Sequence, residues 1–73
     1  MITFDPFWET LKRKNISQYT LTRHYGLSTG TLDALRKNKS ITLYTLDMLC
    51  TMLDCDIADI IVYKKDEKEP EKK

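Results

Sequence analysis

The chain is poor in the residues that build metal and redox sites. Its 73 residues include a single histidine, His24, and two cysteines, Cys50 and Cys55. The cysteines are five positions apart and form no C-x-x-C pair. A structural zinc site needs four ligands at a recognisable spacing, so the sequence predicts no metal ion. We expect two reduced thiols packed in or near the core.

The signatures of an enzyme are missing as well. With two glycines in total, the chain has no glycine-rich loop to bind phosphates. It has no nucleophile motif and no carboxylate pair beside the histidine, which argues against acid–base catalysis. We therefore expect neither enzymatic activity nor a cofactor nor a small-molecule ligand, and we assign His24 a structural or surface role.

Long apolar runs are also absent. No stretch is long enough to form a transmembrane helix. The opening residues, MITFDPFW, lack the basic region and the long apolar segment of a signal peptide. These absences predict a cytoplasmic protein. The length predicts one small domain, which buries about 60% of its unfolded surface.

The most specific pattern lies in residues 18–37, QYTLTRHYGLSTGTLDALRK. Its first half, residues 18–25, predicts a short helix. One side of that helix is formed by Tyr19, Leu21, Thr22 and Tyr25. Gly26 follows at a position that favours a left-handed helix cap, because glycine has no Cβ to clash.

The second half predicts another helix over residues 29–37. Leu27 in the turn before it is apolar and is expected to be buried. Ser28 is a good N-cap, because its hydroxyl can accept a hydrogen bond from a backbone N–H. Leu32 and Leu35 are three residues apart and are expected to face inward. Two short helices joined by a tight glycine turn form a helix-turn-helix, whose second helix lies in the DNA major groove.

The charges are separated along the chain, although the net charge is only +1. Residues 12–39 contain a single acid, Asp33, and residues 40–63 contain four acids and no lysine or arginine. The basic residues of the first segment are Lys12, Arg13, Lys14, Arg23, Arg36, Lys37 and Lys39. Such polarity steers a phosphate backbone to one face. Accidental clustering on a solvated surface is the alternative, and the overlap with the helix-turn-helix argues against it.

The spacing resembles the helix-turn-helix of the Cro and phage-repressor family, often called Xre-type. Gln18 opens the first helix, and the other positions at the family's spacing are Gly26, Leu32 and Leu35. The flanking stretches FDPFWETLKRKNIS and SITLYTLDMLCTMLDCDIADII are similar to the family's first helix and to its fourth and fifth helices. Thr22 departs from the pattern, since the family usually has alanine or another very small residue there.

The resemblance implies an all-α, compact five-helix lambda-repressor-like domain over residues 1–63. Asp5 is the predicted N-cap of the first helix, with Pro6 at its first position. Thr42 is expected to cap the fourth helix, and Asp56 to start the fifth. The residues expected to face inward from these last two helices are Leu43, Leu46, Leu49, Cys50, Leu53, Ile57, Ile60 and Ile61.

The two ends of this domain have a different character. Residues 1–4 and 60–63 are compatible with β-structure, and we expect them to meet as a small strand pair or as packed extended termini. Residues 64–73, KKDEKEPEKK, contain no apolar residue and are predicted to form a charged disordered tail.

Two methionines of the predicted fourth helix leave an alternative open. Met48 and Met52 either complete the core or form an exposed patch for a partner.

The family's DNA contacts carry over by position. The resemblance implies that Gln18 donates to a DNA phosphate and braces the second helix. It implies that Thr29, Gly30, Asp33 and Ala34 of that helix face base edges, while Thr31 faces the DNA backbone. It also implies that the basic loop after the helix holds phosphates. The predicted DNA-binding residues are Gln18, Ser28, Thr29, Gly30, Thr31, Asp33, Ala34, Lys37, Asn38 and Lys39.

The predicted function is a sequence-specific transcriptional regulator that places helix 29–37 in the major groove of double-stranded DNA. The alternative is a protein-interaction module, such as an antitoxin-like partner, on the same fold. The acid at Asp33 and the low net charge favour that alternative, whereas Gln18 and the basic segment favour DNA. One unit contacts few base pairs, so a homodimer is expected, at least on DNA. Its candidate surfaces are the fifth helix, the Tyr63 region and the flank of Met48 and Met52.

Overall fold

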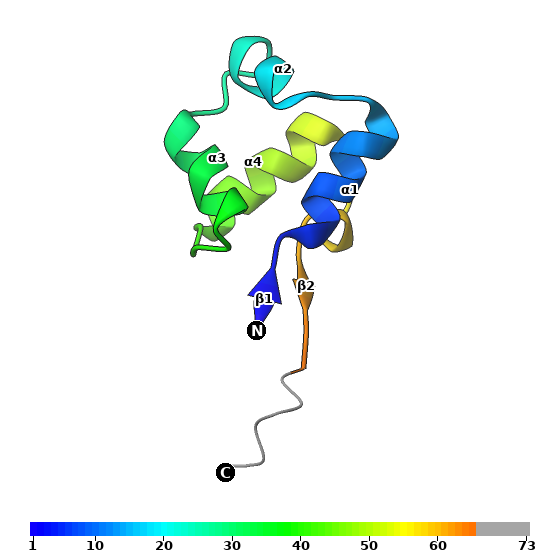
Figure 1. Cartoon of the computed structure of the whole chain (residues 1–73), viewed down its shortest axis with the longest axis vertical. Helices are drawn as coiled ribbons and strands as arrows, with labels where there is room; N and C mark the ends of the chain where they lie inside the picture. The colour runs from blue at the N-terminus through cyan, green and yellow to red at the C-terminus, as the bar shows by residue number, and fades with distance from the viewer. Residues whose placement is uncertain (66–73) are drawn as a thin grey trace.

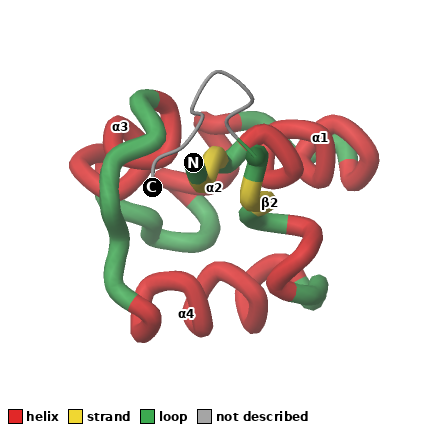
Figure 2. Tube along the Cα trace, turned by 90° about the horizontal axis from the view of Figure 1, so that it is seen from below, coloured by secondary structure: helices red, strands yellow, loops and turns green. Residues whose placement is uncertain are grey.

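Seven short elements follow one another along residues 1–65, the part of the chain that the computed structural model describes. They are β1 (Ile2–Thr3), α1 (Asp5–Lys14), α2 (Gln18–Arg23), α3 (Thr29–Arg36), α4 (Leu43–Leu53), the 3-10 helix η1 (Ile57–Asp59) and β2 (Val62–Tyr63). In Figure 1, α1, α2 and α3 form an arc around α4, and the strand pair lies at the end opposite α2. Figure 2 shows α4 along one outer edge of the molecule.

Three of the helices begin in the same way, with a hydroxyl residue followed three positions later by threonine. Ser17 Oγ accepts from the backbone N–H of Thr20 at 3.1 Å, and its oxygen is 3.0 Å from the Thr20 hydroxyl. The same pairing recurs between Ser28 and Thr31 at α3 and between Thr42 and Thr45 at α4. The predicted N-caps Ser28 and Thr42 are therefore confirmed, and each of the three hydroxyls satisfies one of the N–H groups that a helix start leaves unpaired.

Two of the helices end at a residue with left-handed backbone conformation, and a third is followed by one. Asn15 (φ 57°) ends α1, Asp54 (φ 52°) ends α4, and Asn38 (φ 56°) follows α3. Gly26 has φ 74° in the turn between α2 and α3, as predicted. The predicted helix over residues 18–25 is two residues too long, because α2 ends at Arg23 and His24 caps it.

One apolar cluster connects all of these elements. Phe7, Leu21, Leu35, Leu49 and Ile60 have no exposed surface, and each comes from a different segment. The remaining buried apolar residues are Phe4, Leu11, Leu27, Leu32, Leu46 and Leu53. Partly buried residues packed against the cluster include Trp8, Met48, Cys50, Met52, Cys55 and Ile61, so the two methionines contribute to the core.

Two residues expected to lie inward are exposed instead, as are two tyrosines predicted to share one side of the helix over residues 18–25. Leu43 is 82% exposed and Ile57 is 57% exposed, although both fit the helical periodicity of the core residues. Tyr19 is 65% exposed and Tyr25 42% exposed. Periodicity identifies one side of a helix but not where along it a neighbouring element stops covering that side. Leu43 begins α4, and Ile57 begins the short helix η1.

Four α-helices, not five, are present in residues 1–65. The segment predicted as the fifth helix forms the three-residue 3-10 helix η1, and the chain then turns into β2. It is still fixed to α1, because the Thr10 hydroxyl donates to the carbonyl oxygen of Asp59 at 2.8 Å and Arg13 forms an ion pair with the Asp59 carboxylate at 3.7 Å. Thr10 is buried, although the polarity of its side chain gives no sign of a core position in the sequence.

The two ends of the domain pair as antiparallel strands, which confirms the predicted strand pair. Ile2 lies opposite Tyr63, and Thr3 opposite Val62. Lys64 extends this pairing, since its N–H donates to the carbonyl of Met1 at 2.7 Å and its ammonium forms an ion pair with Asp5. The predicted tail otherwise lies outside the described residues, from 66 to 73.

Asp5 does not act as the predicted N-cap of α1. The helix includes Asp5 in its first turn, and the capping position is Phe4, which has no side chain to accept an N–H. The carboxylate of Asp5 accepts a hydrogen bond from Lys64 instead. That hydrogen bond is the main cause that lowers the pKa of Asp5 below its usual value.

The loop after α3 is fixed to the start of the chain through Asn38. Its side-chain oxygen accepts the backbone N–H of Phe4 at 2.9 Å, across 34 positions of sequence. We expect Asn38→Ala to lower the free energy of unfolding by about 2 kcal/mol, because it leaves that N–H unpaired and strains a left-handed residue. Chemical denaturation measures this change.

Asn38→Gly is the matched control, since glycine keeps the left-handed conformation and loses only the acceptor. Its stability should fall between those of the wild type and Asn38→Ala. An Asn38→Ala variant as stable as the wild type would show that this hydrogen bond contributes nothing to the fold.

Candidate nucleic-acid interface

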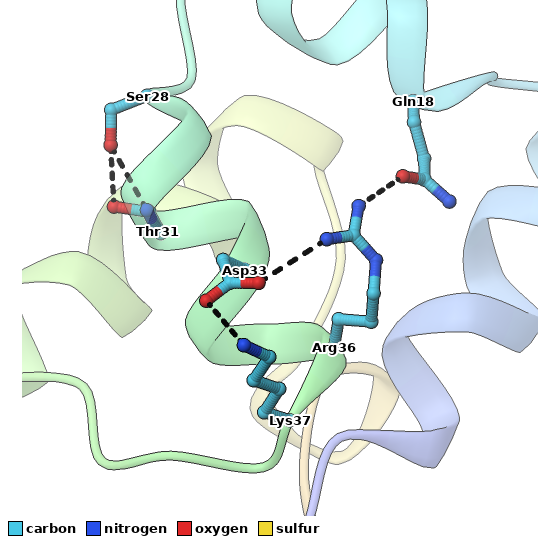
Figure 3. A network of polar contacts seen from close by, with 6 residues as sticks. All are labelled: Gln18, Ser28, Thr31, Asp33, Arg36 and Lys37. Atoms are coloured by element: carbon cyan, nitrogen blue, oxygen red, sulfur yellow. Dashed lines mark hydrogen bonds and ion pairs between the residues drawn. The ribbon is translucent and has the colours of Figure 1, made fainter.

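A hydrogen bond joins the two helices of the helix-turn-helix. Arg36, in the last turn of α3, donates from Nη2 to Oε1 of Gln18, the first residue of α2, at 2.7 Å (Figure 3). Because the oxygen of Gln18 is used here, its amide N–H groups are left to donate outward. Gln18 thus contacts the helix that it was predicted to brace.

Asp33 lies between two cations on α3. Its carboxylate is 3.5 Å from Arg36 Nη1 and 3.4 Å from Lys37 Nζ (Figure 3). Both pairs are partly exposed, so their direct contribution to stability is small. These ion pairs instead fix the positions of the two cations. The Asp33 carboxylate holds the Arg36 guanidinium toward Gln18 and keeps the Lys37 ammonium beside the helix. Asp33 is therefore charge-balanced and does not present an isolated negative charge.

The hydroxyls at the start of α3 have different functions. Ser28 Oγ accepts from the backbone N–H of Thr31 and donates to Thr31 Oγ1 at 2.9 Å, so its own proton is already used (Figure 3). The Thr31 hydroxyl then keeps its proton for an outside acceptor. Of this hydrogen-bonded pair, Thr31 is therefore the residue whose hydroxyl is free to donate.

The exposed side of α3 is formed by small residues. Thr29 and Gly30 are exposed, and Thr31, Asp33 and Ala34 are half-buried. Gly30, Thr31 and Ala34 line one wall of an open hollow, and residues 40–42 and Thr45 line the rest. An incoming molecule therefore meets a shallow surface with backbone close to it, without long side chains in the way.

The loop after α3 places all three predicted residues at the surface, but the side-chain oxygen of one of them is used within the protein. Lys37 and Lys39 are exposed. Asn38 is also on the surface, but its side-chain oxygen is bound to the N–H of Phe4. Lys39 is held near the helix end by its backbone N–H, which donates to the carbonyl of Ala34 at 2.8 Å.

The basic residues of segment 12–39 do not all share this surface. Arg13 is paired with Asp59 at η1, where α1 and η1 are in contact. The guanidinium of Arg23 lies 5.5 Å from the ring centroid of Tyr19, a cation–π contact within α2. Lys12 lines a depression together with Ser17 and Gln18, next to the start of α2. The cations at the end of α3 and in the loop after it are Arg36, Lys37 and Lys39.

The cysteines lie away from this surface. Cys50 and Cys55 are free, half-buried thiols that line one depression between α4 and η1. Burial is the main cause that raises the pKa of each thiol, so both remain protonated at neutral pH. Within residues 1–65 no three potential ligands gather into a metal site, and no helix there has the length and apolarity to cross a membrane.

Comparison with known proteins agrees with this geometry. The Cro/C1-type HTH DNA-binding domain matches residues 7–66 of the chain. The chain belongs to this family. YozG of Bacillus subtilis (strain 168), described as an uncharacterized HTH-type transcriptional regulator, is 34% identical over 59 residues, which span 78% of this chain and 70% of YozG.

A solved structure supports the same membership. The crystal structure of the transcriptional regulator VanUg has a TM-score of 0.75 and 30% identity, over 84% of this chain and 81% of that one. The Cro and phage-repressor resemblance inferred from the spacing of Gln18, Gly26, Leu32 and Leu35 is thus confirmed. As a member of the Cro/C1-type family, the chain is a DNA-binding transcriptional regulator.

Arg36 is a member of this site that the predicted set did not include. In the sequence it stands out only as one of the basic residues of segment 12–39. The spacing from Asp33 is i to i+3, which brings the two onto one side of a helix. The contact with Gln18 joins residues 18 positions apart and depends on how α2 crosses α3, which no local pattern records.

Gly30 has no structural need to be glycine. A Cβ at this position would meet nothing within 4 Å, and the residue lies in the first turn of α3. We expect Gly30→Ala to raise the free energy of unfolding by about 0.5 kcal/mol, because alanine has less backbone entropy to lose. Thermal unfolding measures this difference.

Gly26→Ala is the contrasting variant, because its φ of 74° strains any residue with a Cβ. It should lower stability by about 1–2 kcal/mol. If Gly30→Ala also lowered stability, the space observed around Gly30 would not exist in solution. A stabilised Gly30→Ala variant with weaker DNA binding would show that the backbone at this position approaches DNA closely.

Proposed function

We propose that the chain is a sequence-specific regulator that inserts α3 into the major groove. The observation that carries this proposal is the contact between Gln18 and Arg36, which fixes α3 against α2 while its small side chains stay partly or fully exposed. A recognition helix needs a fixed position and an accessible surface. Its register against the bases depends on how the neighbouring helix is held on the DNA backbone.

Base contacts are assigned to the exposed start of α3. The methyl groups of Thr29 and Ala34 are suited to pack on a thymine methyl, and the Thr29 hydroxyl can donate to a base acceptor. Gly30 lets the backbone approach the base edges. Asp33 can accept from a cytosine amine, and its pairing with Arg36 and Lys37 offsets its repulsion from phosphates.

Phosphate contacts are assigned to donors on both sides of α3. The amide of Gln18 and the hydroxyl of Thr31 have N–H or O–H groups left over from their internal hydrogen bonds. Lys37 and Lys39 add two exposed ammonium groups. Contacts of this kind set the register and orientation of the protein, whereas the base contacts supply specificity.

Two further features belong to this proposal. One α3 helix reads few base pairs, so we propose that the protein binds as a homodimer to two half-sites about one helical turn apart. We also propose a cytoplasmic location, since a regulator of this kind has to reach DNA. The alternative of a protein-interaction module loses support, because the charge of Asp33 is balanced within α3.

Selection from random-sequence duplex DNA, repeated across a salt series, tests the proposal. We expect an enriched site with two-fold symmetry and an affinity that falls steeply as salt rises, because phosphate contacts release counterions. Steep salt dependence without an enriched site would indicate a non-specific binder. No binding at low salt would contradict the proposal.

Lys37→Gln and Arg13→Gln remove the same charge from two sides of the molecule. We expect Lys37→Gln to weaken binding to all sequences alike and to lower the slope of affinity against salt by about one. Arg13→Gln should bind like the wild type, since Arg13 belongs to α1 and lies against η1 instead of on α3. The reverse pattern would place the DNA on the other side of the domain.

A further inference from the structure

The end of α4 is closed by two backbone hydrogen bonds around the left-handed residue Asp54. The N–H of Asp54 donates to the carbonyl of Thr51 at 3.3 Å. The N–H of Cys55 donates to the carbonyl of Cys50 at 3.0 Å. Together with the φ of 52° at Asp54, these bonds form a Schellman motif. In this motif the residue after the left-handed one commonly contacts the residue five positions before it, and here both are cysteine.

The same motif closes α1 with an aliphatic pair in place of the two thiols. Asn15 is the left-handed residue there, and the N–H of Ile16 donates to the carbonyl of Leu11 at 2.9 Å. Leu11 is buried, and Ile16 packs against the core. Aliphatic side chains are therefore sufficient to close a helix of this protein in this way, and packing alone does not require two sulfurs at the end of α4.

Cys50 and Cys55 are accessible from one side. Both are half-buried, and both line the depression of about 410 Å³ between α4 and η1. Burial is the main cause that raises the pKa of each thiol, and each cysteine also shifts the pKa of the other, as expected of neighbouring sulfurs. A ligand that enters the depression therefore meets two thiols together.

The surroundings of the pair indicate which kind of ligand it takes. Asp47 and Asp56 line the same depression, and their charge attracts cations. Protonated thiols attack peroxides and disulfides slowly, because the thiolate is the nucleophile. Soft metal ions prefer sulfur ligands, and Cu(I) and Hg(II) are satisfied by two of them. Within residues 1–65 no third ligand joins the pair, as a zinc site would require.

We propose that Cys50 and Cys55 bind one soft metal ion, Cu(I) or Hg(II), between their two Sγ atoms. Both S–H bonds break, two sulfur–metal bonds form, and both protons pass to solvent without any change of oxidation state. The bound ion joins the end of α4 to the segment that leads into η1, so it stabilises the folded chain. The site is independent of the proposed function, because neither cysteine lines the hollow beside α3.

Titration of the reduced protein without oxygen tests the site with each ion. Cu(I) is followed by competition with a coloured Cu(I) chelator, and Hg(II) by the absorption of its thiolate complex. We expect one ion per chain for at least one of the two metals. Cys50→Ser and Cys55→Ser should each lower the affinity about a hundredfold, because the second thiolate binds at the high effective concentration set by the first. One ion per two chains, no binding of either ion, or unchanged affinity in either variant would overturn the proposal.

Thermal unfolding separates a site formed by the fold from any two thiols near each other in sequence. Excess metal should raise the Tm of the wild type by about 5 °C or more, because the ion binds the folded chain more tightly than the unfolded one. Cys50→Ser combined with Thr51→Cys is the matched control. It keeps two thiols but moves one to an exposed position that does not line the depression.

The control variant should bind the metal more weakly than the wild type and show no rise in Tm. Circular dichroism of the metal-free proteins verifies that each variant keeps the fold. An equal rise in Tm in the control variant, or no rise in the wild type, would show that the fold does not prepare the two thiols for a metal ion and would overturn the proposal.

Discussion

The hydrogen bond from Arg36 to Gln18 is the contact on which the DNA-binding surface depends. It joins the end of α3 to the start of α2, and Asp33 holds the guanidinium in place from the other side. Without it, α3 would be attached to α2 only by the short turn at Gly26 and by buried leucines. These contacts fix the distance between the two helices better than the angle at which they cross. An exposed helix with small side chains reads DNA only if its direction is fixed.

The core and the left-handed helix ends make that contact possible. Leu21, Leu27 and Leu35 are buried in one cluster, so α2 and α3 cannot separate without exposing apolar surface. Asn38 ends the segment by binding Phe4, which connects the loop after α3 to the strand pair. Lys37 and Lys39 therefore lie on either side of a fixed point, and their positions follow from the fold.

Much of this arrangement was predictable because its signals are local. Ser17, Ser28 and Thr42 act within one turn of their own helix, and Gly26 has a backbone requirement of its own. Contacts between distant segments were not predictable in this way. The exposure of Leu43, the inward oxygen of Asn38 and the position of Arg36 each depend on a neighbour that periodicity does not identify. The candidate site was predicted from the family's spacing, and Arg36 was left out of it because a tertiary contact decides the position of that side chain.

The measurement that tests the central claim most directly is a titration of the ¹⁵N-labelled protein with a duplex carrying the selected site, followed by NMR. The expected result is that the largest shift changes occur in the backbone amides of residues 29–34 and in the side-chain amide of Gln18. Changes confined to the start of α4 and to η1, with α3 unaffected, would contradict the claim that α3 is the helix that reads DNA.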